Sequence, residues 1–281
     1  MQALDTRFVV FNAAAGLVGL TAVVFAVRTL LPSPATPCAE RYNTAMTFAL
    51  ERGGAVLTAA DLQTRLGGRD VGLSRNVEIA RLQDGPVPVG MAVTLPKEPV
   101  AGPDTAAVDG GLSFPWEPRA LQSQRAVCLS YQVMLPANFD ASVGGLLPGI
   151  RGADRSGGAD DGFVARPAWR ASGEGGADQA VRAGSERRSL RLEAHGFALS
   201  RGRWARLDQE VVLNAPNRRD GIYRIWVDGV LVLDRTDLEL RATPGITISG
   251  VAASVFYGGE DAIARAPRDT KIWLSPFEVR W

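Results

Sequence analysis

Residues 222–233 read IYRIWVDGVLVL, two apolar runs on either side of the pair Asp228-Gly229. An Asp-Gly pair between two such runs is the strongest short-range signal for a β-hairpin, because both turn positions need a positive φ. The stretch therefore predicts two antiparallel strands joined by a two-residue turn.

Further strands are predicted on both sides of this hairpin. Apolar and polar residues alternate over 127–135 and again over 205–211, which is the period of a half-buried strand. Ile246–Tyr257 and Lys271–Trp281 add more strands. No strand alternates with a long amphipathic helix, which argues against a parallel α/β sheet. We expect an all-β fold, an antiparallel jelly roll or sandwich, over residues 67–281.

The chain before residue 67 is different in character. Residues 1–31 are predicted to form a membrane anchor, and residues 32–66 a proline-rich stalk (PSPATP, 32–37) followed by a juxtamembrane segment. Within it, residues 59–66 are predicted to be a short helix, since Thr58 and Asp61 have the spacing of a capping box. A glycine-rich segment, 151–188, is interpreted either as a functional flap or as a solvated surface excursion.

The anchor prediction rests on the uncharged run from Phe8 to Val27. Twenty helical residues span about 30 Å, the thickness of a hydrocarbon core. A cleaved signal peptide is the alternative, but its apolar region is usually shorter and this run lacks a clear cleavage site. Arg7, Arg28 and Arg41 flank the run on both sides, so the charge pattern does not decide its orientation.

Two cysteines, Cys38 and Cys128, lie ninety residues apart in a chain with no others. In an exported protein such a pair favours a disulfide, whereas in the cytosol it would be two unrelated thiols. With the anchor, this predicts a single-pass inner-membrane protein whose main domain lies in the periplasm.

Composition excludes several classes of function. Thirty-one basic and thirty acidic residues give a net charge of +1, which argues against binding nucleic acid by bulk electrostatics. Only Lys97 and Lys271 are lysines, so the other 29 basic residues are arginines. A single histidine, His195, excludes a multi-histidine metal site. We expect no metal and no cofactor.

Several short stretches between residues 110 and 281 form an ordered set. They are 144–150 (GGLLPGI), 163–166 (FVAR) with Trp169-Arg170, 202–204 (GRW) with Gln209 and Leu213-Asn214, Asp220-Gly221, 226–229 (WVDG) and 256–259 (FYGG). Taken in order, these stretches resemble the family 14 polysaccharide lyases. The resemblance implies a β-jelly roll of the kind that cleaves alginate or glucuronan by β-elimination.

The departures from the family pattern concern its chemistry. Leu146 stands where active members carry a lysine that meets the uronate carboxylate, and Val164 occupies a serine position. The family's Tyr-x-Tyr, which acts as base and acid, has no counterpart between Gly173 and Gly184. Arg166 is kept, and its guanidinium suits a carboxylate.

No other residue is a convincing substitute for the missing groups. A lone His195 is more often a structural residue than a catalyst, and Tyr131 and Tyr223 fall on apolar strand faces. Tyr257, before Gly258-Gly259, is the tyrosine that we expect to line a groove, while Lys271 is interpreted as a solvated residue. We therefore name no catalytic residue, and our candidates for glycan binding are Arg166, Trp169, Arg170 and Tyr257.

Two functions are expected from these features. One is a module that binds an acidic polysaccharide, and the other is an accessory subunit of a membrane complex, docked through the N-terminal helix. Asn12, Gly16 and Gly19 weakly favour the second, since small and polar residues mediate helix contacts in membranes. An active polyuronide lyase with a rearranged site is the alternative.

Overall fold

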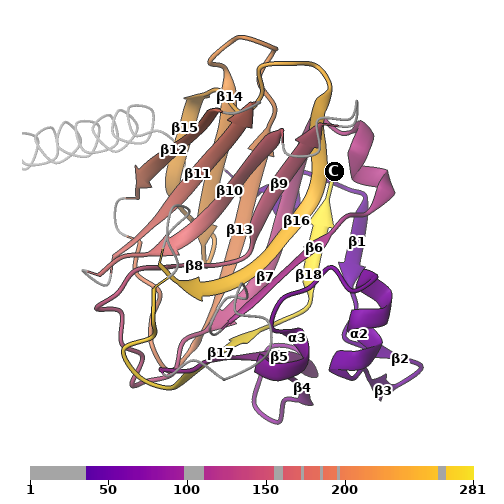
Figure 1. Ribbon diagram of the computed structural model, residues 1–281, viewed down its shortest axis with the longest axis vertical. Coiled ribbons are helices and arrows are strands. Elements are labelled where there is room, and N and C mark those ends of the chain that lie inside the picture. Colours follow the sequence, from indigo (N-terminus) through magenta and orange to yellow (C-terminus); the bar gives the residue numbers. More distant parts are fainter. Residues whose placement is uncertain are drawn as a thin grey trace, which may run out of the picture. The chain divides into compact units, whose positions relative to one another are not determined.

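The computed structural model describes residues 36–97, 111–154, 161–171, 174–183, 186–194, 197–258 and 264–281. Thr36–Trp281 form one compact unit, in which two antiparallel sheets pack face to face (Figure 1). The predicted all-β antiparallel sandwich is thereby confirmed. The predicted span from Phe8 to Val27 lies outside the described residues, and none of the described helices has the length and apolar character to cross a membrane.

The first sheet has nine strands. Their order is β15-β14-β13-β7-β17-β5-β4, with β18 also paired to β7 and β1 paired to β18. The strands are β1 (Ala45–Phe48), β4 (Val77–Arg81), β5 (Val89–Leu95), β7 (Ala126–Met134), β13 (Trp204–Val212), β14 (Gly221–Val227), β15 (Val230–Leu238), β17 (Thr270–Leu274) and β18 (Phe277–Arg280).

The second sheet has seven strands. Their order is β12-β11-β10-β8-β16-β6, and β9 pairs with both β10 and β16. The strands are β6 (Leu112–Trp116), β8 (Gly145–Leu146), β9 (Gly149–Asp154), β10 (Gly162–Trp169), β11 (Gly175–Ala183), β12 (Glu186–Glu193) and β16 (Ile246–Tyr257). In Figure 1 this sheet lies in front of β13, β14 and β15.

Short elements complete the described chain. They are η1 (Cys38–Glu40), β2 (Glu51–Arg52), β3 (Ala55–Val56), α2 (Ala59–Leu66), α3 (Leu73–Asn76) and η2 (Arg119–Ser123). Helix α2 has the predicted bounds and the predicted capping box, in which Thr58 and Asp61 each accept a hydrogen bond from the other's backbone N–H.

The hairpin read from residues 222–233 is also confirmed. Strands β14 and β15 pair up to Val227 and Val230. Asp228 and Gly229 both have positive φ, 49° and 81°, as a type I′ turn requires. The predicted final strand over Lys271–Trp281 forms as two strands, β17 and β18, interrupted at Ser275-Pro276.

Part of the predicted juxtamembrane segment packs into the sandwich. Strand β1 extends the nine-stranded sheet by pairing with β18, and Phe48 and Leu50 are buried in the core. Helix α2 adds Leu62 and Leu66 to the same core. The compact unit therefore includes residues 36–66 as well as the predicted domain, because this segment carries apolar side chains that the sandwich buries.

Residues 38–42 are fastened to the outer face of the nine-stranded sheet. Cys38 and Cys128 form the predicted disulfide, with their Cα atoms 5.6 Å apart. Three residues surround the buried carboxylate of Glu210: Arg41 and Arg224 form ion pairs with it at 2.8 and 3.2 Å, and Tyr42 donates a hydrogen bond of 2.7 Å.

The glycine-rich segment 151–188 is neither a flap nor a loose surface excursion over its described residues. It supplies most of β9, all of β10 and β11 and the start of β12. Its glycines allow close packing: a Cβ at Gly152 would lie 2.1 Å from the ring of Phe163, and one at Gly175 would lie 1.7 Å from the ring of Phe197. Glycine composition here reflects tight contacts within a sheet.

Candidate functional site

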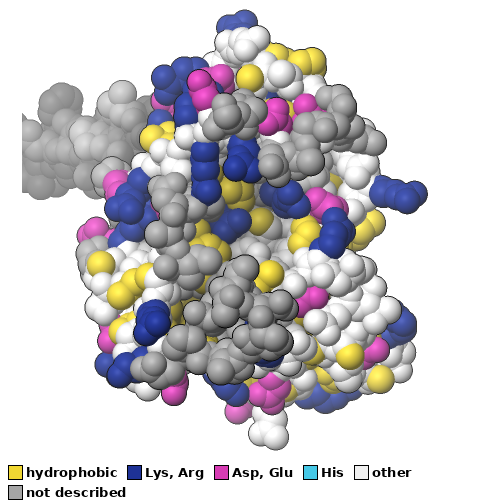
Figure 2. All heavy atoms as spheres, in the orientation of Figure 1, with side chains coloured by type: hydrophobic (Ala, Val, Ile, Leu, Met, Phe, Trp, Pro, Cys, Tyr) yellow, Lys and Arg dark blue, Asp and Glu magenta, His cyan; other side chains and the backbone are white. Residues whose placement is uncertain are grey.

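The outer face of the seven-stranded sheet carries the candidate site. Phe163 and Val181 point into the sandwich core, so the alternating neighbours Val164, Arg166 and Arg182 point outward. Figure 2 shows Lys and Arg side chains, in dark blue, gathered on this face. The site is thus built on paired strands, which hold side chains more precisely than loops do.

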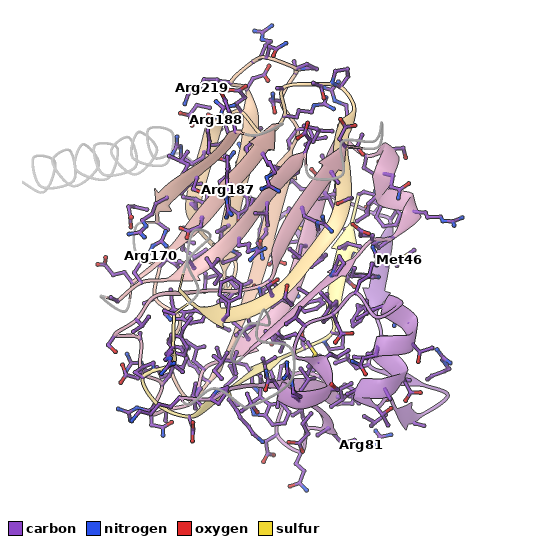
Figure 3. All side chains as sticks on the ribbon, viewed as in Figure 1. Met46, Arg81, Arg170, Arg187, Arg188 and Arg219 are labelled. Carbon is purple, nitrogen blue, oxygen red and sulfur yellow. A yellow bond between two sulfur atoms is a disulfide. The ribbon has the colours of Figure 1, made fainter. Side chains whose placement is uncertain are left out.

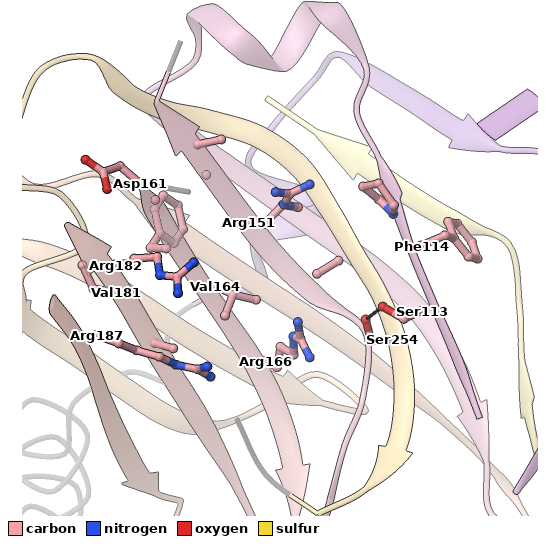
Figure 4. Close-up of a pocket in the computed structure, with 17 residues that line it drawn as sticks. Ser113, Phe114, Arg151, Asp161, Val164, Arg166, Val181, Arg182, Arg187 and Ser254 are labelled. Atoms are coloured by element: carbon pink, nitrogen blue, oxygen red, sulfur yellow. Dashed lines mark hydrogen bonds between the residues drawn. The ribbon is translucent and has the colours of Figure 1, made fainter. Parts of the chain in front are cut away.

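Four arginines from four strands line one hollow of about 340 Å³ on this face. We call this hollow the arginine pocket, and Figure 4 shows its arginine side chains together above the strands. They are Arg151 from β9, Arg166 from β10, Arg182 from β11 and Arg187 from β12. Asp161 is the one acidic residue in the lining.

Strand register explains how these arginines surround a floor of small side chains. Arg151 lies directly opposite Val164, which lies opposite Ala180. In a neighbouring row, Arg182 lies directly opposite Arg187. Strands are about 4.8 Å apart and alternate residues about 6.7 Å apart along a strand, so the four arginine side chains reach a common space.

An ion pair with Glu117, beside the pocket, holds the side chain of Arg151 in place. Its Nη1 lies 2.8 Å from Oε1 of Glu117, whose other oxygen accepts a hydrogen bond of 2.7 Å from Arg69. On the same edge of the pocket, the hydroxyls of Ser113 and Ser254 are hydrogen-bonded at 2.9 Å (Figure 4). These contacts join β6, β9 and β16 beside the pocket.

Arg170 belongs to a second hollow, of about 490 Å³. Its Nη1 pairs with Asp178 at 2.8 Å, and its Nη2 donates to the carbonyl oxygen of Ala177 at 3.0 Å. Arg191 and Glu193 also line this hollow. Positive and negative side chains are therefore equal in number here, two of each, whereas the arginine pocket has four arginines and one aspartate.

Leu146, at the position that the family resemblance assigns to a lysine, lies in an apolar cluster. It is fully buried, pairs with Ala168 on β10 and Phe256 on β16, and forms a separate buried cluster with them. The guanidinium of Arg166 lies 5.8 Å from the centre of the Phe256 ring. The candidate carboxylate-binding arginine thus borders an apolar patch that has no proton to give.

None of the four tyrosines lines the arginine pocket. Tyr131 and Tyr223 are fully inside the sandwich, where burial raises the pKa of each phenol well above its usual value. Burial also raises the pKa of Tyr257, and Tyr42 lies on the other sheet, hydrogen-bonded to Glu210. A raised pKa keeps each phenol protonated, which disfavours a role as general base.

The structure places Trp169 and Tyr257, two of the four predicted glycan-binding residues, in the core. They are 3% and 2% exposed, and their rings make an edge-to-face contact with centres 5.3 Å apart. Nε1 of Trp169 donates to the carbonyl oxygen of Val143, and the Tyr257 hydroxyl donates to that of Asp140. Trp169 lies on the same face of β10 as the core residue Phe163, and Tyr257 lies on the same face of β16 as the core residue Val255. Of the four predicted residues, Arg166 lines the arginine pocket and Arg170 lines another hollow.

We expect Trp169→Ala to lower the free energy of unfolding by about 3–5 kcal/mol, as for other large buried aromatic residues. Besides Tyr257, the ring contacts Phe139 and lies over Gly145, and the substitution leaves a cavity there. Urea unfolding of the variant beside Arg166→Ala measures the effect. A change below 1 kcal/mol would contradict the core assignment of Trp169.

Sequence reasoning missed three of the four pocket arginines: Arg151, Arg182 and Arg187. They lie in the segment 151–188, which the sequence predicts to be a flap or a surface excursion, and neither has a fixed face. The signal that would have found them is strand alternation: on β11 it places Arg182 on the face opposite the buried Val181. His195 lies outside the described residues.

This architecture is an antiparallel jelly roll with a basic hollow on one outer face. The chain belongs to the polysaccharide lyase 14 family, whose model matches residues 88–277. A comparison with curated proteins found no match.

Solved structures support the same fold. A PL-14 alginate lyase from Aplysia kurodai matches with a TM-score of 0.65 and 20% identity, over 85% of this chain and 98% of that one. The Chlorella virus alginate lyase vAL-1 matches with 0.60 and 17%, over 79% and 96%. An endo-β-1,4-glucuronan lyase from Trichoderma reesei matches with 0.53 and 11%, over 73% and 86%.

Proposed function

We propose that this protein binds an acidic polysaccharide in the arginine pocket and does not cleave it. The observation that carries the proposal is that one sheet face holds a cluster of arginines but has an apolar cluster where the family has its lysine. Arg166 and three further arginines supply positive charge, while Leu146, Ala168 and Phe256 form an apolar cluster at the position of the family's lysine.

Binding follows from the chemistry of arginine. A guanidinium is always charged and can donate two parallel hydrogen bonds to one carboxylate. Four such groups around one hollow favour a chain with repeated anionic groups, and the lyases of similar fold act on alginate and glucuronan. A pocket of this kind favours the glycan-binding role over a purely structural role as a membrane-complex subunit.

Absence of cleavage follows from the missing proton transfer. β-Elimination must remove the C5 proton, stabilise charge on the carboxylate and protonate the leaving oxygen. Arg166 is suited to the carboxylate, but Leu146 adds no charge beside it and the four tyrosines lie elsewhere. The alternative of an active polyuronide lyase would need a base that none of these residues supplies.

Affinity for oligoguluronate tests the binding role. We expect Arg166→Ala to weaken binding about tenfold or more, since a charge-assisted pair contributes about 1.5–3 kcal/mol. Binding should also weaken as salt rises. Arg81→Ala is the control: Arg81 is exposed and lies away from the pocket at the lower end of Figure 3. Equal losses in both variants, or no binding by the parent, would contradict the proposal.

The cellular setting is a separate proposal. The run Phe8–Val27 and the disulfide support a single-pass inner-membrane protein with its sandwich in the periplasm. We expect the mature protein to keep its N-terminus and to stay with membranes at high salt. Fractionation with intact-mass analysis tests this, and a mature N-terminus near Ala35 or Cys38 would disprove it.

A further inference from the structure

The two hollows on the outer face of the seven-stranded sheet differ in charge balance. In the second hollow, Arg170 and Arg191 are matched by Asp178 and Glu193. In the arginine pocket, four arginines face a single aspartate, which leaves an excess of three positive side chains in the lining. Two carboxylates outside the lining offset part of this: Glu117 pairs with Arg151, and Asp178 lies directly opposite Arg166 on β11.

Two of these arginines lie side by side. Arg182 and Arg187 are directly opposite each other on β11 and β12, so one anion can accept hydrogen bonds from both guanidinium groups. Both side chains are exposed at the rim of the pocket, and Figure 4 shows their guanidinium groups on the same side of the strands.

The number of arginines indicates the kind of anion. A carboxylate has two oxygens and is matched by one guanidinium in a two-bond contact. A sulfate or phosphate monoester presents three terminal oxygens, which can accept hydrogen bonds from several guanidinium groups at once. The floor is small, formed by Gly162, Val164 and Ala180, so a compact tetrahedral group has room between the arginine side chains.

We propose that the arginine pocket recognises a sulfate or phosphate monoester on a glycan, in preference to a uronate carboxylate. This inference rests on the proposed glycan-binding function and makes it more specific. Arg182, Arg187 and Arg151 contact the ester oxygens, and Arg166, beside Phe256, is the contact to the adjoining sugar unit. The hydroxyls of Ser113 and Ser254 lie on the opposite side of the pocket from Arg187 (Figure 4).

Cello-oligosaccharides that differ only at C6 test the proposal. The probes carry a carboxylate, a sulfate or a phosphate at that carbon, with equal length and equal substitution, and the unsubstituted oligosaccharide is the blank. Carboxylate and sulfate have the same charge, so that pair compares geometry alone. With full-length protein in mild detergent, we expect at least one ester probe to bind about tenfold more tightly than the carboxylate probe.

Substitutions in the pocket show which residues are responsible for the preference for an ester. Arg182→Ala/Arg187→Ala should bring the ester probe down to the affinity of the carboxylate probe. Arg188→Ala is the matched control, because Arg188 lies next to Arg187 on β12, faces the other way and pairs with Glu239. Thermal unfolding verifies that the double variant is folded, and both of its substituted positions are exposed.

The possible outcomes distinguish failure of the ester preference from failure of the glycan-binding function. Carboxylate binding that equals or exceeds ester binding overturns the ester preference and leaves the glycan-binding function standing. Failure of all charged probes to bind overturns both. A preference for phosphate that declines as pH falls through about 6 identifies a phosphate ester, because its second ionisation lies there, whereas sulfate binding does not change in that range.

Discussion

We expect no unsaturated uronate to form when the protein is incubated with alginate or glucuronan, at neutral or alkaline pH. General acid–base assistance accounts for about 10²- to 10⁴-fold of an enzymatic rate, and one electrostatic donor for about 10²- to 10³-fold. Leu146 is buried among Ala168 and Phe256, and the tyrosines lie away from the pocket, so we expect both contributions to be missing. Their combined loss should place the rate below ordinary detection.

Absorbance in the ultraviolet band of the unsaturated product measures this, with an active polysaccharide lyase as positive control. Leu146→Lys alone should not restore activity, because it supplies charge without supplying a base. Steady product formation by the parent protein that Arg166→Ala abolishes would overturn the proposal, and the active-lyase alternative would then replace it.

We expect loss of the Cys38–Cys128 disulfide to lower the stability of the protein strongly. Closing a loop of 90 residues lowers the entropy of the unfolded chain, which corresponds to about 4–5 kcal/mol in the chain-entropy model. For a domain of this size, that lowers the midpoint of thermal unfolding by about 8–20 °C. The buried carboxylate of Glu210 adds to the effect, since release of residues 38–42 removes its contacts with Arg41 and Tyr42.

Thermal unfolding with and without reductant measures the loss. Reductant should lower the midpoint of the parent towards that of Cys38→Ala/Cys128→Ala, and it should leave the double variant unchanged. In denatured, unreduced parent protein neither thiol should react with an alkylating reagent, because an oxidised bridge has no thiolate. Two reactive thiols under those conditions would contradict the bridge.

Much of the fold could be predicted from the sequence because its signals are local. The turn at Asp228-Gly229 needs positive φ at two successive residues, and the helix 59–66 is defined by its own capping box. Alternation over 127–135 marks a strand whatever its neighbours are. The cysteine pair also followed from the sequence, since two cysteines allow a single intramolecular bridge.

Only the tertiary structure decided the composition of the candidate site. The sequence determined that Leu146 stands where the family resemblance implies a lysine and that residues 173–184 contain no tyrosine, and the proposed absence of cleavage rests on these two facts. It did not determine that Trp169 faces inward while Arg166 faces outward, or that four strands bring their arginines to one hollow. The reason is physical: a side chain's face depends on strand register and on which sheet face is covered, and both are set by pairing between distant segments.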